Sequence, residues 1–153
     1  MLRLATTDDA ERIAELEIIL FDNAFNEWTI ANEIEAGAGL VVENEAGELC
    51  GYALVRFERD LVDLTRLAVR PADQGQGLGG LMLSQVVLDT RPVMLTGWKN
   101  NNGAIRLYRR FGFEIVGELE AGAWVMKRHP MEATLNEVRQ VAHRTTPFWP
   151  AAG

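Results

Sequence analysis

The sequence predicts a mixed α/β fold in which a sheet carries helices on both of its faces. Runs rich in β-branched and apolar residues alternate along the chain with segments whose apolar residues recur at helical spacing. A glycine-rich stretch at residues 75–80 connects one such strand to one such helix. The chain has 153 residues, of which 48% are hydrophobic. This size and composition suit one globular domain with a single core.

The N-terminal part is expected to contain a short strand followed by two helices. Residues 2–5 form the predicted strand, and Thr6 or Thr7 then caps the first helix. The apolar face of that helix is predicted to hold Ala10, Ile13, Leu16, Glu17 and Leu20. The second helix is expected at residues 27–36, before Gly37 and Gly39. Its inward-facing residues are predicted to be Trp28, Ile30 and Ile34.

The remaining segments complete the sheet and its helices. Residues 40–44 and 49–58 are expected to form a hairpin, because a turn containing a glycine separates them. Residues 61–69 form the predicted central strand, and a helix follows the glycine-rich stretch. The sequence then predicts a strand at 92–96, a helix at 103–111 and strands at 113–118 and 123–128.

The glycine-rich stretch predicts a site for a phosphate-bearing ligand. Glycines let the backbone approach an anion without Cβ clashes, and the first amides of the following helix attract negative charge. The spacing Gly75-x-Gly77-x-x-Gly80 also matches the dinucleotide fingerprint, but no Asp or Glu stands about 20 residues further on to hold a ribose. A P-loop does not fit, because Leu81 and Met82 occupy the places of its Lys and Ser or Thr.

Two sequence blocks carry a resemblance to a known family. The first is Gln-x-x-Gly-x-Gly at residues 74–79, and the second is Asn-x-x-Ala-x-x-Leu-Tyr-x-x-x-Gly-Phe at residues 101–113. Together they closely resemble the motifs of the GNAT superfamily of acetyl-coenzyme A-dependent N-acetyltransferases. The resemblance implies a mostly antiparallel sheet whose middle strands splay apart, with helices on both faces. It covers about residues 1–128, which leaves residues 129–153 as a C-terminal extension that either docks or stays flexible.

The resemblance also implies acetyl-coenzyme A as the co-substrate, with no metal. The amides of its pantetheine arm are expected to pair with the backbone of Leu67, Ala68 and Val69. Asn101 is either a contact to the cofactor or only a helix cap. The pyrophosphate is expected to contact the backbone of Gln74, Gly75, Gln76, Gly77, Leu78, Gly79 and Gly80.

Tyr108 is the predicted general acid. A phenol with a pKa near 10 stays protonated at neutral pH and can donate to a departing thiolate. The general base is less clearly marked, because Thr96 stands where the branch of the family that acetylates protein N-termini carries a glutamate. Asp63 is the candidate base, acting through water, and a solvated aspartate at a strand edge is the alternative.

Two features bear on the identity of the acceptor, namely the lack of a strong general base and the net charge. At pH 7 an α-amine gives up its proton at a cost of about 1–1.4 kcal/mol, against about 4–5 kcal/mol for lysine. The net charge of −7 argues against a nucleic-acid surface, and it either modestly favours a cationic acceptor or only aids solubility. The expected acceptor is a protein or peptide N-terminus, slightly ahead of a small amine or an amino-acid derivative. A sensor that binds acyl-coenzyme A without catalysis is the alternative.

Cysteine content and apolar runs give two further expectations. The single cysteine, Cys50, is expected to be a buried packing residue. No stretch resembles a signal peptide or a membrane span, which predicts a cytoplasmic protein without membrane contact. A homodimer is left open.

Overall fold

The structure, a computed structural model, describes residues 1–130, and these form two compact units. The first unit contains Met1–Phe57 and Leu64–Met82, and the second contains Glu58–Asp63 and the described residues from Leu83 onward. Strand β4 (Val62–Val69) and helix α3 (Leu78–Val86) contribute residues to both units. The predicted C-terminal extension lies outside the described residues, apart from its first two positions. Its boundary and role stay predictions.

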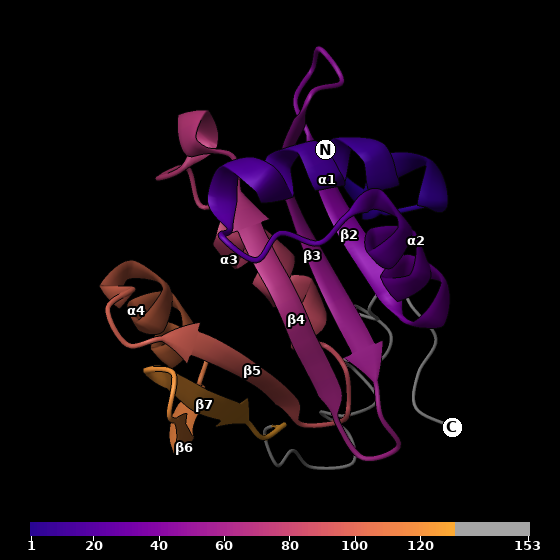
Figure 1. Ribbon diagram of the computed structural model, residues 1–153. Coiled ribbons are helices and arrows are strands. Elements are labelled where there is room, and N and C mark those ends of the chain that lie inside the picture. The colour runs from indigo at the N-terminus through magenta and orange to yellow at the C-terminus, as the bar shows by residue number, and fades with distance from the viewer. Residues whose placement is uncertain (131–153) are drawn as a thin grey trace. The chain divides into compact units, whose positions relative to one another are not determined.

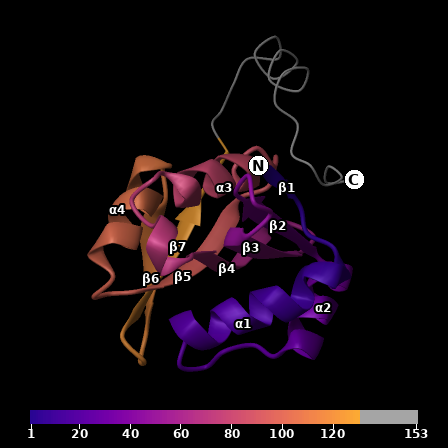
Figure 2. The same cartoon turned by 90° about the horizontal axis from the view of Figure 1, so that it is seen from above.

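The first unit is a sheet with helices on both faces. Strands β1 (Leu2–Leu4), β2 (Ala38–Glu43) and β3 (Leu49–Phe57) pair in antiparallel order, and β4 follows beside β3 (Figure 1). Helices α1 (Ala10–Leu20) and α2 (Glu27–Ala36) cover one face (Figure 2). On β3, Tyr52 reaches Glu17 of α1, whereas a Cβ added to Gly51 would lie 3.1 Å from Met82 of α3. Successive strand residues point to opposite faces, so both faces of β3 are covered.

The burial of α1 and α2 confirms most of the predicted inner faces. In α1 the residues Ala10, Ile13, Leu16 and Glu17 are buried, and in α2 Ile30 is completely buried and Ile34 packs against the core. The prediction for Trp28 is wrong, because its side chain is 75% exposed. Trp28 stands two positions before Ile30, which is a rotation of about 200° around a helix, so the two side chains face opposite ways.

The second unit contains three antiparallel strands and one complete helix. The strands lie in the order β5 (Val93–Trp98), β7 (Ala123–Arg128) and β6 (Glu114–Leu119). The start of β4 also belongs here, since the N–H of Val62 donates to the carbonyl of Pro92 at 2.8 Å. Helix α4 (Asn102–Arg110) packs on β5.

These elements confirm the predicted fold class, a mixed and mostly antiparallel α/β fold. The splay of the middle strands stays a prediction. Among residues 1–130, no helix combines the length and the apolar character that crossing a bilayer requires.

A buried carboxylate, Glu17, joins separate parts of the first unit. Its side chain is fully buried and accepts hydrogen bonds from the hydroxyl of Tyr52 and from the N–H of Phe25, the latter at 2.9 Å. Arg66 of β4 forms an ion pair with Glu17 at 3.2 Å. The Arg66 guanidinium also lies 4.4 Å from the ring centre of Phe21 and 3.9 Å from that of Phe25. Burial and the neighbouring Glu17 raise the pKa of Tyr52, so its hydroxyl stays a donor.

Replacing this carboxylate is expected to destabilise the fold strongly. Glu17→Gln should lower the free energy of unfolding by about 3 kcal/mol, because it leaves the Arg66 charge without its partner. Glu33→Gln is the matched control. Its partner Arg56 is 51% exposed, and ion pairs with an exposed partner contribute about 0–1 kcal/mol. Chemical denaturation measures both variants, and equal losses would contradict the special role of Glu17.

Candidate active site

The predicted pyrophosphate loop lies in the first unit, between β4 and α3. Gly75 and Gly77 have φ values of 82° and 81°, in the left-handed region that favours glycine. Nothing lies within 4 Å of a Cβ built on either residue, so the loop borders open space. The N–H of Leu81 donates to the carbonyl of Gly77 at 3.0 Å. The preceding amides, at residues 78–80, therefore belong to the first helical turn, which has no intrahelical acceptor.

The structure brings the loop and the end of β4 together. Leu67, Ala68 and Val69 end the strand, and the side-chain amide of Gln74 donates to the carbonyl of Val69 at 3.1 Å. Gln74 thus ties the start of the loop back to the strand. The ion pair between Arg70 and Asp73, at 2.6 Å, braces the short turn between them. The side chain of Gln76, whose backbone is a predicted pyrophosphate contact, is exposed.

Cys50 behaves as the expected packing residue. Its side chain is buried, and its thiol lies near Asp73. Burial, followed by the hydrogen bond to Asp73, raises the pKa of the thiol. The protonated thiol is a poor nucleophile.

Asn101 and Tyr108 both belong to the α4 segment of the second unit. The side-chain oxygen of Asn101 accepts a hydrogen bond from the N–H of Ala104 at 3.2 Å, so Asn101 caps the helix. Its contact to a cofactor stays a prediction. Tyr108 is 8% exposed, and its ring packs at a tilt against Phe113, with 5.9 Å between ring centres. Burial raises the pKa of Tyr108 to about 12, so the phenol keeps its proton at physiological pH.

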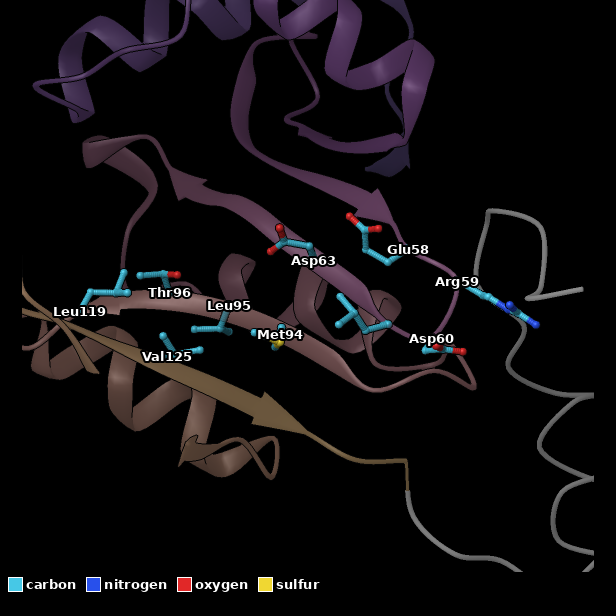
Figure 3. Close-up of a pocket in the computed structure, with 10 residues that line it drawn as sticks. Glu58, Arg59, Asp60, Asp63, Met94, Leu95, Thr96, Leu119 and Val125 are labelled. Atoms are coloured by element: carbon cyan, nitrogen blue, oxygen red, sulfur yellow. The ribbon is translucent and has the colours of Figure 1, made fainter. Parts of the chain in front are cut away.

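A pocket of about 560 Å³ lies in the second unit, at the beginning of β4 and β5. It brings together Asp63 and Thr96, which project toward the same space (Figure 3). Glu58 and Asp60, in the turn before β4, add two further carboxylates. The Arg59 side chain extends away from the other lining residues in Figure 3. The remaining lining residues are apolar: Leu61, Met94, Leu95, Leu119 and Val125.

Backbone contacts fix the turn that carries these carboxylates. The N–H of Glu58 donates to the carbonyl of Leu61 at 2.9 Å and closes the turn. A guanidinium nitrogen of Arg91 donates to the carbonyl of Glu58 at 3.2 Å, and Arg91 also pairs with the buried Asp89 at 2.9 Å. The sequence interpretation missed Glu58 and Asp60 as pocket residues. The available signal was their place directly before the candidate base in the chain.

Tyr108 and the pocket residue Thr96 lie on opposite faces of β5. A Cβ added to Gly97 would lie 3.6 Å from the Tyr108 ring, so this position faces α4. Thr96 precedes Gly97 in the strand and therefore points to the other face. Tyr108, the predicted general acid, and the pocket with the candidate base Asp63 thus lie on opposite sides of one strand.

A comparison with family models decides the classification. The model of the acetyltransferase (GNAT) domain matches residues 35–115, which is more than half of the chain. The chain belongs to the GNAT acetyltransferase family. The predicted resemblance is thereby confirmed.

Relatives of the chain are named for different acceptors. The chain is 33% identical over 121 residues to the N-alpha-acetyltransferase RimI of Mycobacterium tuberculosis, an alignment that covers 73% of this chain and 77% of that protein. It is 34% identical over 88 residues to a spermine/spermidine N(1)-acetyltransferase of Bacillus subtilis, covering 48% of this chain and 58% of that relative. The chain thus spans little more than half the length of this relative.

The fold is also found in solved GNAT structures. The ribosomal-protein-S18-alanine N-acetyltransferase of Escherichia coli superimposes with a TM-score of 0.74 at 22% identity, over 89% of this chain and 98% of that chain. At this identity the similarity establishes the common fold.

The donor groups of the glycine loop suit the pyrophosphate of the GNAT co-substrate, acetyl-coenzyme A. The loop offers backbone amides at a helix N-terminus and open space in front of two left-handed glycines. Within residues 1–130, no group of three or more His, Cys, Asp or Glu is placed to hold a metal ion.

Gly77→Val is expected to raise the Kd for coenzyme A by at least about tenfold, because a side chain would enter the space where the phosphates approach. Gly47→Val is the matched control. Gly47 also has a positive φ, 79°, and open surroundings, but it lies in the β2–β3 turn. Calorimetric titration measures both variants, and equal affinities would contradict the assignment of the loop.

Proposed function

We propose that the protein is an acetyl-coenzyme A-dependent N-acetyltransferase that acts on a primary amine. The observation that carries the proposal is Tyr108, a buried and protonated phenol on the helix that follows β5 in a GNAT domain. Acetyl-coenzyme A supplies an acetyl thioester whose leaving group is a thiolate. The hydroxyl of Tyr108 is the group that protonates this thiolate.

In the proposed reaction the amine attacks the acetyl carbon directly. A C–N bond forms, the C–S bond breaks, and the thiolate takes the proton of the Tyr108 hydroxyl. Asp63 accepts the proton lost by the amine, through a water molecule. Thr96 cannot serve as this base, because its hydroxyl does not ionise near neutral pH. The shared pocket of Asp63 and Thr96 supports this division of roles.

Opposite faces of β5 suit the two proton transfers. The pocket side holds Asp63, and the α4 side holds Tyr108. We assign the entry of the amine to the pocket side and the protonation of the sulfur to the α4 side.

Two classes of acceptor have support from the relatives. Similarity to RimI supports a protein N-terminus, and similarity to the spermine/spermidine enzyme supports a polyamine. A thiol-release assay with acetyl-coenzyme A against peptides of varied N-terminus, polyamines, amino acids and aminoglycosides tests the proposal. Turnover on one class identifies the acceptor, whereas tight cofactor binding without turnover on any class would favour a sensor.

Tyr108→Phe is expected to lower kcat on the order of 100-fold, because it removes the general acid. The phenylalanine ring keeps the packing against Phe113, so the free energy of unfolding and the Kd for coenzyme A should change little. Steady-state kinetics and calorimetry check the two parts. An unaltered kcat would reduce Tyr108 to a packing residue.

Asp63→Asn is expected to lower kcat/KM by about 10–100-fold, in line with the loss of a general base. The exposed Glu114, which does not line the pocket, provides the matched control Glu114→Gln. The loss should shrink as the pH approaches the pKa of the acceptor amine, because more amine is then already neutral. A loss that is constant with pH would argue against Asp63 as the base.

A further inference from the structure

The pocket beside Asp63 and Thr96 combines two kinds of surface. Its lining contains Leu61, Met94 and Val125 among other apolar side chains, and it also contains carboxylates. Apolar walls accommodate methylene groups, whereas carboxylates accommodate ammonium groups. This combination suits an aliphatic chain that bears positive charge.

The carboxylates are distributed along the pocket. Figure 3 shows Thr96 and Leu119 at one end, Asp60 at the other, and Asp63 between them. The pocket therefore offers negative charge both beside Thr96 and toward its opposite end (Figure 3).

The local charge of the pocket is negative. Glu58, Asp60 and Asp63 contribute three carboxylates, and Arg59 is the one basic residue of the lining. Its side chain extends away from the others, so it does not stand between the carboxylates and an acceptor (Figure 3). The backbone of the turn is held at the carbonyl of Glu58, which accepts a hydrogen bond from Arg91.

We infer that the acceptor is a linear aliphatic amine with a second positive charge, a diamine or polyamine. The inference rests on the proposed function and deepens it. The reacting amine lies at Asp63 and Thr96, the methylene chain follows the apolar wall, and the second ammonium group lies at Glu58 and Asp60. These two residues are then specificity determinants, since they distinguish acceptors that otherwise present the same amine.

The test compares two acceptors of equal chain length, 1,4-diaminobutane and butylamine. The wild-type protein should have a kcat/KM for the diamine higher on the order of tenfold, and this preference should fall as the salt concentration rises. In Glu58→Gln/Asp60→Asn the preference should largely disappear. Glu114→Gln/Glu120→Gln removes the same two charges from exposed positions outside the pocket lining and should retain the preference.

A second readout does not depend on turnover. Calorimetric titration of 1,4-diaminobutane into the protein with coenzyme A should show binding that weakens in the pocket variant alone. Turnover of butylamine and the diamine at equal kcat/KM, or turnover confined to peptide N-termini, would overturn this inference and leave the N-acetyltransferase intact. Absence of turnover on every acceptor, despite cofactor binding, would overturn the proposed function and the inference with it.

Discussion

The buried pair of Glu17 and Arg66 is the constraint on which the first unit depends. A buried carboxylate without a partner costs several kcal/mol, so the parts that supply its partners must come to one place. These parts are β3 through Tyr52, the α1–α2 connection through Phe25, and β4 through Arg66. The residues that follow Arg66 in β4 are the predicted contacts of the pantetheine arm, and Gln74 ties the glycine loop to the end of that strand. The ion pair therefore holds the strand that carries the proposed cofactor contacts.

In the second unit, hydrogen bonds fix the backbone near the pocket, whereas the side chains with proposed functions differ in their exposure. Arg91 links the buried Asp89 to the turn before β4, and the N–H of Val62 holds the start of that strand at Pro92. The carboxylates of this turn are exposed, whereas Tyr108 is almost fully buried on α4. Exposure suits groups that bind a cation from solvent. Burial suits an acid that must keep its proton, because the apolar surroundings disfavour the phenolate.

Features that depend on local sequence could be predicted, and features that depend on distant contacts could not. The order of strands and helices and the bounds of α2 and β7 follow from periodicity and turn residues. The glycine loop was readable because a positive φ favours glycine wherever it occurs. Glu17 was predicted on the inner face of α1, but its partner Arg66 lies 49 positions away and has no sequence signal. Trp28 was assigned inward from its apolar character, although the helical rotation from Ile30 places it outward. The pocket was missed because residues 58–63 and 94–96 meet only after the strands pair.

The lack of a glutamate at position 96, where Thr96 stands, and the acidic pocket together constrain the acceptor. A carboxylate beside an ammonium group stabilises the charged form and raises the pKa of that amine. Each unit of such a shift adds about 1.4 kcal/mol to the cost of producing the neutral nucleophile. Three carboxylates around the reacting amine would therefore hinder attack, unless one of them removes the proton. Two of the three, Glu58 and Asp60, lie in the turn before β4, whereas Asp63 lies in β4 itself and projects toward the same space as Thr96 (Figure 3). Attraction to a distant charge strengthens binding without deactivating the nucleophile, and this is the arrangement that an acceptor with two separated amines can use.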